Sequence, residues 1–168
     1  MNASPLSLGY LVFESPRPPA WRRFCGEVLG LPEPTENADG SLGWQLDDLC
    51  QRLMVQTGPA DDLAALGLEC ADDAALEAVL AHLARAGTPA EQADRPLRRA
   101  RRVRRLYTLR DPEGNAVELF TGLEPAERPF ASPAFPQGFC TGQGLGHAVL
   151  VGRNLARLES FYAALPGF

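Results

Sequence analysis

The feature that most constrains this chain is an internal repeat. Residues 144–168 match residues 7–31 without a gap, so that Leu8-Gly9 aligns with Leu145-Gly146 and Phe24 aligns with Phe161. Both copies predict a strand, then a helix, then a glycine that ends the helix. A repeat at so long a period indicates two copies of one folded module. Because the second copy holds one strand and one helix, we predict a complete domain followed by the opening of another.

Length and composition predict an ordinary globular protein. With 168 residues, 45% of them hydrophobic and 22% charged, the chain can bury a sizeable core. Its net charge of −5 gives no reason to expect nucleic acid or a membrane as partner, and no apolar run approaches the roughly 20 residues of a membrane span. We expect a cytoplasmic protein whose four scattered cysteines are reduced thiols, mostly in the core.

The hydrophobic pattern predicts two units of the same kind, the first of which ends near residue 57. A strand over 6–14 precedes a helix that carries Trp21, Phe24, Cys25, Val28 and Leu29 at helical spacing and ends at Gly30. Residues 32–41 read as a loop, and two short strands follow over 42–46 and 52–57.

The second unit repeats this order. A strand over 66–70 precedes a helix capped by Asp72 or Asp73, and its stripe of Leu76, Val79, Leu80 and Leu83 stops at Gly87. Strands follow over 104–110 and 116–120, joined by the turn Asp111-Pro112-Glu113-Gly114-Asn115. Strand-rich units with one helix each predict an α+β fold, a curved sheet covered on one side by helices. We divide the chain into a domain over 6–121, a Pro- and Gly-rich linker over 122–143 that winds across a surface, and an incomplete unit over 144–168.

Three sets of polar residues are candidates for function. His147 stands in the apolar segment Leu145–Val149, predicted as a strand, where it is either a metal ligand or a packed core histidine. Glu118, also in an apolar strand, either faces solvent at a sheet edge, makes a structural hydrogen bond, or binds a metal; the pattern favours the first two. The arginines of residues 98–105 either form a solvated strand and loop, contact another subunit, or hold phosphates, which the acidic chain disfavours.

Several segments together resemble a known family. Leu8-Gly9-Tyr10, the stretch Asp111-Pro112-Glu113-Gly114-Asn115-Ala116-Val117-Glu118 and Thr141-Gly142-Gln143-Gly144-Leu145-Gly146-His147 are similar to the type I extradiol ring-cleaving dioxygenases of the vicinal oxygen chelate superfamily. The similarity runs in one register from Ser7 to Phe168. It implies paired βαβββ modules, with a metal-free cup in the N-terminal domain. It also implies Fe(II), or Mn(II) in some members, held by two His and one Glu in the C-terminal domain.

Individual positions follow from the resemblance. His147 matches the first metal ligand, and Val149, two residues on, matches a position that lines the substrate pocket. The remaining ligands and the acid–base residues would lie beyond residue 168. In the first domain Tyr10 stands where a His ligand would be and Ala65 stands near the second ligand, so Glu118 is a relic there. A phenol and one carboxylate do not make the two-His, one-carboxylate triad of Fe(II).

The resemblance implies extradiol cleavage of a catechol, such as a 2,3-dihydroxybiphenyl-like ring, by O₂ in the complete enzyme. We expect the isolated chain to bind little or no iron and to cleave little or no substrate. The alternatives are a non-catalytic module that binds a small aromatic molecule and a structural or oligomerisation domain. We also expect a homo-oligomer. Because residues 144–168 lack a partner module, Ala148, Val149, Leu150, Phe161 and Tyr162 should be partly exposed, with the segment packed on a second chain or mobile.

Overall fold

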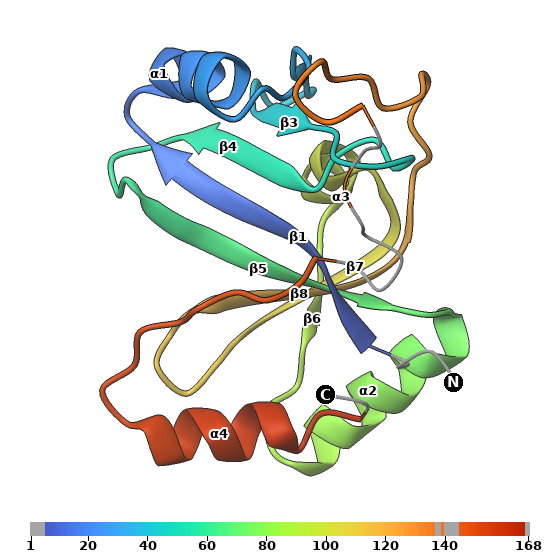
Figure 1. Cartoon of the computed structure of the whole chain (residues 1–168). Helices are drawn as coiled ribbons and strands as arrows, with labels where there is room; N and C mark the ends of the chain where they lie inside the picture. The colour runs from blue at the N-terminus through green and yellow to red at the C-terminus, as the bar shows by residue number, and fades with distance from the viewer. Residues whose placement is uncertain (1–5, 137–138, 140–144, 167–168) are drawn as a thin grey trace.

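A computed structural model describes residues 6–136, 139 and 145–166, which form one eight-stranded sheet and its covering helices (Figure 1). The first module consists of strand β1 (Leu6–Ser15), helix α1 (Pro18–Arg23), which runs on into the π-helical turn η1 (Phe24–Val28), and strands β2 (Thr35–Glu36), β3 (Leu42–Trp44) and β4 (Leu53–Thr57). The second consists of β5 (Asp62–Cys70), α2 (Asp73–Arg85), β6 (Glu91–Gln92), α3 (Arg95–Arg101), β7 (Val103–Arg110) and β8 (Ala116–Leu123). Helix α4 (Leu155–Ala163) follows.

The order of the strands shows that the two modules are arranged alike. The sheet runs β2-β3-β4-β1-β5-β8-β7-β6, so each module contributes four adjacent strands and the modules meet where β1 pairs antiparallel with β5. In each module the first strand also pairs parallel with the last, β1 with β4 and β5 with β8. The predicted α+β fold of paired βαβββ modules is therefore confirmed.

Alternation along β1 separates the two faces of the sheet. Tyr10 and Val12 lie in the cluster of the inner face, whereas Leu11 and Phe13 pack on the outer face, which α1 and α2 cover. A bulge between Leu8 and Tyr10 shifts the pairing by one residue, so Leu8 also points outward. In Figure 1, α1 lies at the top of the sheet and α2 and α4 at the bottom.

Helix α3 and residues 145–151 differ from the sequence prediction. Residues 95–101 form a helix on the inner face, where a solvated strand or loop was predicted, so helices contact both faces of the sheet. Residues 145–151 form no strand: the Leu145 amide donates to the Leu8 carbonyl of β1 at 2.7 Å, but no strand of the described chain forms a ladder with them. The predicted helix after that segment is present as α4, but its predicted stop at Gly167 lies outside the described residues.

The linker begins two residues later than predicted, because β8 continues to Leu123. Its described part lies along the first module: the amide nitrogens of Cys50 and Ala126 donate to the carbonyl oxygens of Glu124 and Asp48, at 2.9 and 2.8 Å. Cys25, Cys50 and Cys70 are free and buried as expected, and Cys140 lies outside the described residues.

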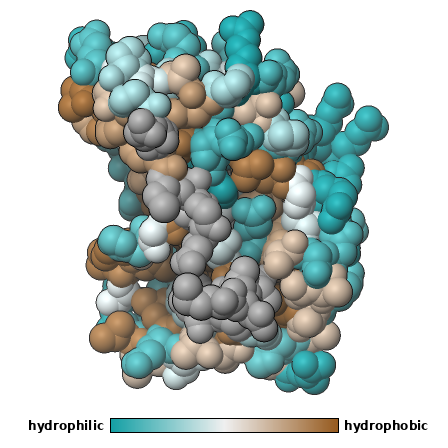
Figure 2. Space-filling view, turned by 45° about the vertical axis from the view of Figure 1, so that its right-hand side comes forward, coloured by the Kyte–Doolittle hydropathy of each residue, from teal (hydrophilic) through white to brown (hydrophobic). Residues whose placement is uncertain are grey.

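Hydrophobic side chains also reach the surface. On the face drawn in Figure 2, hydrophilic residues cover much of the right-hand edge, and hydrophobic residues gather in patches at the left and centre. Over the described chain the large exposed hydrophobic residues are Phe24, Val28, Leu29, Phe139, Val149, Val151 and Leu155. None of the described helices combines the length and the apolar character needed to cross a membrane.

Candidate functional site

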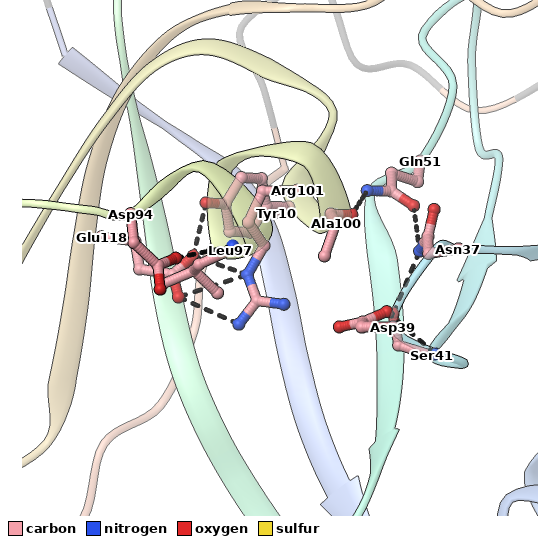
Figure 3. Close-up of polar contacts among 10 residues, drawn as sticks. All are labelled: Tyr10, Asn37, Asp39, Ser41, Gln51, Asp94, Leu97, Ala100, Arg101 and Glu118. Carbon is pink, nitrogen blue, oxygen red and sulfur yellow. Dashed lines mark hydrogen bonds and ion pairs between the residues drawn. The ribbon is translucent and has the colours of Figure 1, made fainter.

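Three side chains from distant parts of the chain lie together on the inner face of the sheet, as Figure 3 shows. The Tyr10 hydroxyl on β1 donates to Glu118 Oε2 on β8 at 2.5 Å. The Arg101 guanidinium, at the end of α3, grips the same carboxylate with two nitrogens: Nε lies 2.9 Å from Oε2 and Nη2 lies 3.0 Å from Oε1. Tyr10, Arg101 and Glu118 are 0, 3 and 3% exposed. We call these three residues the buried triad.

Local structure explains how each member reaches this place. Tyr10 lies flat against Gly67 of β5, where an added Cβ would lie 2.2 Å from the ring, and it stacks on Phe120 with 4.6 Å between ring centroids. Helix α3 begins at Asp94, whose side chain accepts from the Leu97 amide at 2.9 Å. It ends at Arg102, a residue with φ of 54°, and this stop directs Arg101 inward.

Burial and charge set the protonation of the buried triad. Burial, followed by the negative charge of Glu118, raises the pKa of Tyr10 well above its usual value of 10, so the phenol is a neutral donor. Burial by itself lowers the pKa of Arg101, but the charge and hydrogen bonds of Glu118 outweigh it and the pKa is raised. The triad therefore holds one positive and one negative charge, each compensated by the other.

A second hydrogen-bonded chain fixes the other side of α3. Gln51 Nε2 donates to the Ala100 carbonyl at 2.9 Å, and Asn37 Nδ2 donates to Gln51 Oε1 at 2.9 Å (Figure 3). Gln51 is completely buried and Asn37 is 8% exposed. These contacts join the loop before β3 to the helix that carries Arg101, so the interior is filled by ordered polar side chains as well as by apolar ones.

The interior of this domain does not fit a metal ion. Both oxygens of Glu118 are engaged by Arg101, and one of them also by Tyr10. Ala65, near the expected second ligand position, has no donor atom and packs in the same cluster as Tyr10. Among the described residues no group of three or more His, Cys, Asp and Glu is placed to hold a metal. The interpretation of Glu118 as a structural hydrogen-bond partner is confirmed. The predicted solvent-facing position at a sheet edge is wrong, because β8 lies between β5 and β7.

Most of the arginine run is engaged within the chain. Arg102 pairs with Glu124 at 2.9 Å, Arg104 with Asp73 at 2.8 Å and Arg105 with Glu77 at 2.6 Å. Arg98 Nη1 donates to the carbonyl of Arg104 at 3.5 Å. These arginines therefore connect α3, β7 and α2 to one another and to the chain after β8. Few of their guanidinium groups remain available to bind a phosphate or another subunit.

Residues 145–166 pack on the outer face of the sheet and against α2. Leu165 is 3% exposed within the outer cluster, and Ala148, Leu150, Phe161 and Tyr162 pack against it. The turn over 111–115 holds both ends of the helical segment: Glu113 Oε2 accepts from the Arg153 amide at 2.8 Å, and Asp111 Oδ2 accepts from the Tyr162 hydroxyl at 3.0 Å. The expectation that these side chains are partly exposed is confirmed, since Ala148, Leu150, Phe161 and Tyr162 are half-buried. The described segment packs on its own chain, and its contact with a second chain stays a prediction.

His147 and Val149 lie on the opposite side of that segment from the packed residues. His147 is exposed and Val149 is 80% exposed, whereas Ala148 and Leu150 contact the outer cluster. The two candidates therefore share one outward side although no strand forms. Among the described residues no metal-binding group includes His147. Its neighbours Ala148 and Leu150 pack on the outer cluster, whereas Tyr10 lies in the inner one.

Comparison with known proteins gives a consistent result. Residues 8–58 match the family described as Dihydroxybiphenyl dioxygenase BphC D1. The biphenyl-2,3-diol 1,2-dioxygenase of Paraburkholderia xenovorans is 39% identical over 164 residues, which cover 96% of this chain and 55% of that protein. The crystal structure of BphC, a halotolerant catechol dioxygenase, superposes with a TM-score of 0.87 and 32% identity over 96% of this chain and 55% of the other. The chain is a relative of the extradiol ring-cleaving dioxygenases.

The similarity to the extradiol dioxygenases covers only part of those proteins. An iron-dependent extradiol dioxygenase of Rhodococcus jostii, 35% identical, is also matched over 54% of its length. The chain thus spans about half the length of its relatives. Because the structural match includes 96% of this chain, it extends into the segment after the linker.

Sequence reasoning missed Arg101 as a member of the site in this extradiol dioxygenase relative. The run of arginines predicted solvent exposure for all of them, and no pattern in the neighbouring sequence distinguishes the one that is buried. The helix itself could have been found, because Asp94 followed by Pro96 is a typical helix start. The pairing of Arg101 with Glu118 depends on the fold of the whole second module.

Proposed function

We propose that this chain is the N-terminal part of an extradiol dioxygenase whose complete form cleaves a catechol with O₂ and Fe(II). The observation that carries the proposal is the combined match in sequence and fold across nearly the whole chain, at 39% identity to one such enzyme and a TM-score of 0.87 to another. In this proposal residues 6–121 are a non-catalytic domain and residues 144–168 begin the catalytic one.

The packed interior of the first domain favours a structural role for that domain. Tyr10 and Phe120 are fully buried and stack on each other, and Arg101 closes on Glu118. A small aromatic ligand would have to displace these packed side chains, and no observation favours such binding. In our proposal the domain therefore serves as a rigid base for the catalytic unit.

His147 and Val149 are the residues of this chain that we assign to the catalytic unit. An exposed imidazole can give a nitrogen to Fe(II), and Val149 on the same side can contact the ring of the substrate. Fe(II), when bound, would hold the two catechol oxygens and O₂ next to each other. The packing of Ala148 and Leu150 on the outer cluster fixes which side of the segment His147 presents.

The test begins with the coding DNA beyond residue 168, which should continue in frame and encode a further His and Glu. The complete gene product, loaded with Fe(II), should consume O₂ and open 2,3-dihydroxybiphenyl, whereas the 168-residue chain alone should not. Loading with Mn(II) in parallel decides between the two metals. A complete product that binds iron and fails on every catechol tested would refute the proposed activity.

The two histidines of the chain provide a matched pair of variants. His147→Ala in the complete product should abolish ring cleavage and lower the bound iron per subunit. His82→Ala, a change on α2 outside the residues assigned to the proposed site, should leave both unchanged. Equal iron content in the two variants would remove His147 from the ligand set.

A further inference from the structure

The segment that carries His147 is held by the first domain at two backbone positions. Two residues before His147, the Leu145 amide donates to the Leu8 carbonyl of β1 at 2.7 Å. Six residues after it, the Arg153 amide donates to Glu113 Oε2 at 2.8 Å. In Figure 1 the hairpin between β7 and β8, which carries Glu113, lies near the start of α4. His147 therefore lies between two anchors that belong to distant parts of the sequence.

The turn that carries Glu113 is fixed by its own hydrogen bonds. Asp111 Oδ1 accepts from the amides of Glu113 and Asn115 at 2.9 and 3.0 Å, and Asn115 Nδ2 donates to Asp111 Oδ2 at 2.8 Å. Gly114 supplies the φ of 90° that the turn requires. Because the turn is so strongly specified, it presents the Glu113 carboxylate to the neighbouring chain at a defined place.

Gly152 allows the chain after His147 to approach this turn closely. A Cβ at residue 152 would lie 2.2 Å from Leu158 Cδ1 and 3.3 Å from Glu113 Cγ. Leu158 is 6% exposed and is the buried residue of α4, so a larger residue at 152 would push a packed side chain out of place. The backbone at residues 152 and 153 is therefore enclosed between α4 and Glu113.

The hydrogen bond from Arg153 to Glu113 is of a strong kind. Bonds from a backbone amide to a carboxylate are shorter and about twice as strong as neutral ones. Asn154 begins α4 and accepts from the Arg157 amide at 3.1 Å, so Glu113 lies beside the N-terminus of that helix, where a negative charge is favoured. Glu113 therefore restrains both the chain and the helix that follow His147.

We propose that Glu113 is a positioning residue for His147. The inference rests on the proposed function, in which His147 gives a nitrogen to Fe(II). A metal ligand must be held within about 0.5 Å of its productive place, and in the described chain no strand ladder holds the segment of His147. Glu113 acts through the Arg153 backbone rather than on the metal. The first domain, which we propose to be non-catalytic, thus sets the place of a residue in the catalytic unit.

The first test measures iron affinity in the complete gene product. Glu113→Ala should raise the dissociation constant for Fe(II), measured by chelator competition, by about tenfold, because His147 is then less well placed. Glu113→Gln keeps an oxygen that accepts from the Arg153 amide and should restore most of the affinity. Glu91→Ala, a change on the exposed strand β6, is the matched control and should leave the affinity unchanged. An unchanged dissociation constant in Glu113→Ala would overturn the proposal.

The second test measures the anchoring in the iron-free protein. The backbone amides of residues 145–153 should exchange with solvent about tenfold faster in Glu113→Ala than in the wild type, because a local restraint is lost. The urea midpoint should stay unchanged, which separates a loss of positioning from a general loss of stability. Equal exchange in the two proteins, or an iron affinity that Glu113→Gln does not restore, would refute the positioning role.

Failure of the positioning role and failure of the proposed function give different results. If His147→Ala leaves the dissociation constant for Fe(II) unchanged, His147 is not a ligand, and both the ligand assignment and the positioning role fail. If His147→Ala weakens iron binding and Glu113→Ala does not, His147 remains a ligand and only the role of Glu113 is refuted. Weaker binding in both variants, with recovery in Glu113→Gln, is the expected result.

Discussion

The buried triad shows how one residue's chemistry depends on its partners. A buried ion pair adds little net stability relative to apolar residues, but removal of one partner leaves a charge uncompensated in the interior. We predict that Arg101→Met lowers the free energy of unfolding by about 3–5 kcal/mol, measured by urea denaturation. The double variant with Glu118→Gln should lose less than Arg101→Met alone, because a neutral amide still accepts from the Tyr10 hydroxyl and leaves no bare carboxylate. A double variant as unstable as the sum of the singles would contradict this account.

Buried acids in the core also predict a loss of stability at alkaline pH. Burial raises the pKa of Cys25 and Cys50 from 9.0 to about 11 and that of Cys70 to about 12, and it raises the pKa of Tyr10 above 10. Because the folded chain holds these protons more tightly than the unfolded chain does, the stability is fully present below pH 9 and decreases as the pH rises toward 11 and 12.

Urea midpoints measured from pH 7 to pH 11 should stay level at first and then decrease above pH 9. Cys70→Ala should show a shallower decrease than the wild type over that range, even if it is less stable at pH 7. An identical slope in the two proteins would mean that Cys70 does not contribute to the pH dependence.

At this scale the sequence identified positions but not their partners. Glu118 stood out because a carboxylate in an apolar strand needs an explanation, and a structural hydrogen bond was among the expected readings. Arg101, 17 residues away, could not be chosen from the sequence because most of the residues around it are also arginines. Which arginine faces inward depends on where α3 ends, and that in turn depends on the left-handed conformation of Arg102.

At the scale of elements, the turn over 111–115 holds α4 in place. Tyr162→Phe removes its bond to Asp111 and preserves the ring contact with Phe161, whose centroid lies 5.0 Å away. We expect a loss of about 1–2 kcal/mol from the local stability of α4, since one hydrogen bond to a carboxylate is removed. Hydrogen exchange of the amides in α4 should accelerate about tenfold. Ser160→Ala, which removes a hydroxyl that donates to the Ala156 carbonyl within α4, is the control and should leave docking unchanged.

Elements with strong local signals were predicted, and those that depend on neighbours were not. Helix α2 and the turn over 111–115 carry an apolar stripe, a cap and turn residues in the sequence itself. The segment 145–149 carries an equally apolar pattern, but among the described residues it makes one backbone bond to β1, from the Leu145 amide to the Leu8 carbonyl, and no ladder. A strand without a paired ladder leaves most of its backbone groups without partners. The segment of His147 therefore keeps the outward alternation of a strand without becoming one.

At the scale of the whole molecule, the two modules share one sheet and are tied by Arg52. Its guanidinium contacts Asp47 at 2.8 Å and Glu69 at 3.2 Å, and it donates to the Gly9 carbonyl at 2.9 Å. We predict that Arg52→Met lowers the free energy of unfolding by about 2–3 kcal/mol, less than for a fully enclosed pair because Glu69 is partly exposed.

Calorimetry of the Arg52→Met variant should still show one unfolding transition for the two modules, since β1 and β5 pair along most of their length. Two separated transitions in the Arg52→Met variant would show that this side chain, rather than the shared sheet, makes the modules unfold together.

The two-residue strands β2 and β6 are the outermost strands of the sheet. A border this short offers almost no unpaired backbone to a passing chain, so the protein is poorly suited to growth into fibrils by strand addition. Contacts between copies of the protein therefore depend on side chains, which single substitutions can change, rather than on backbone hydrogen bonds, which are the same for almost every residue type.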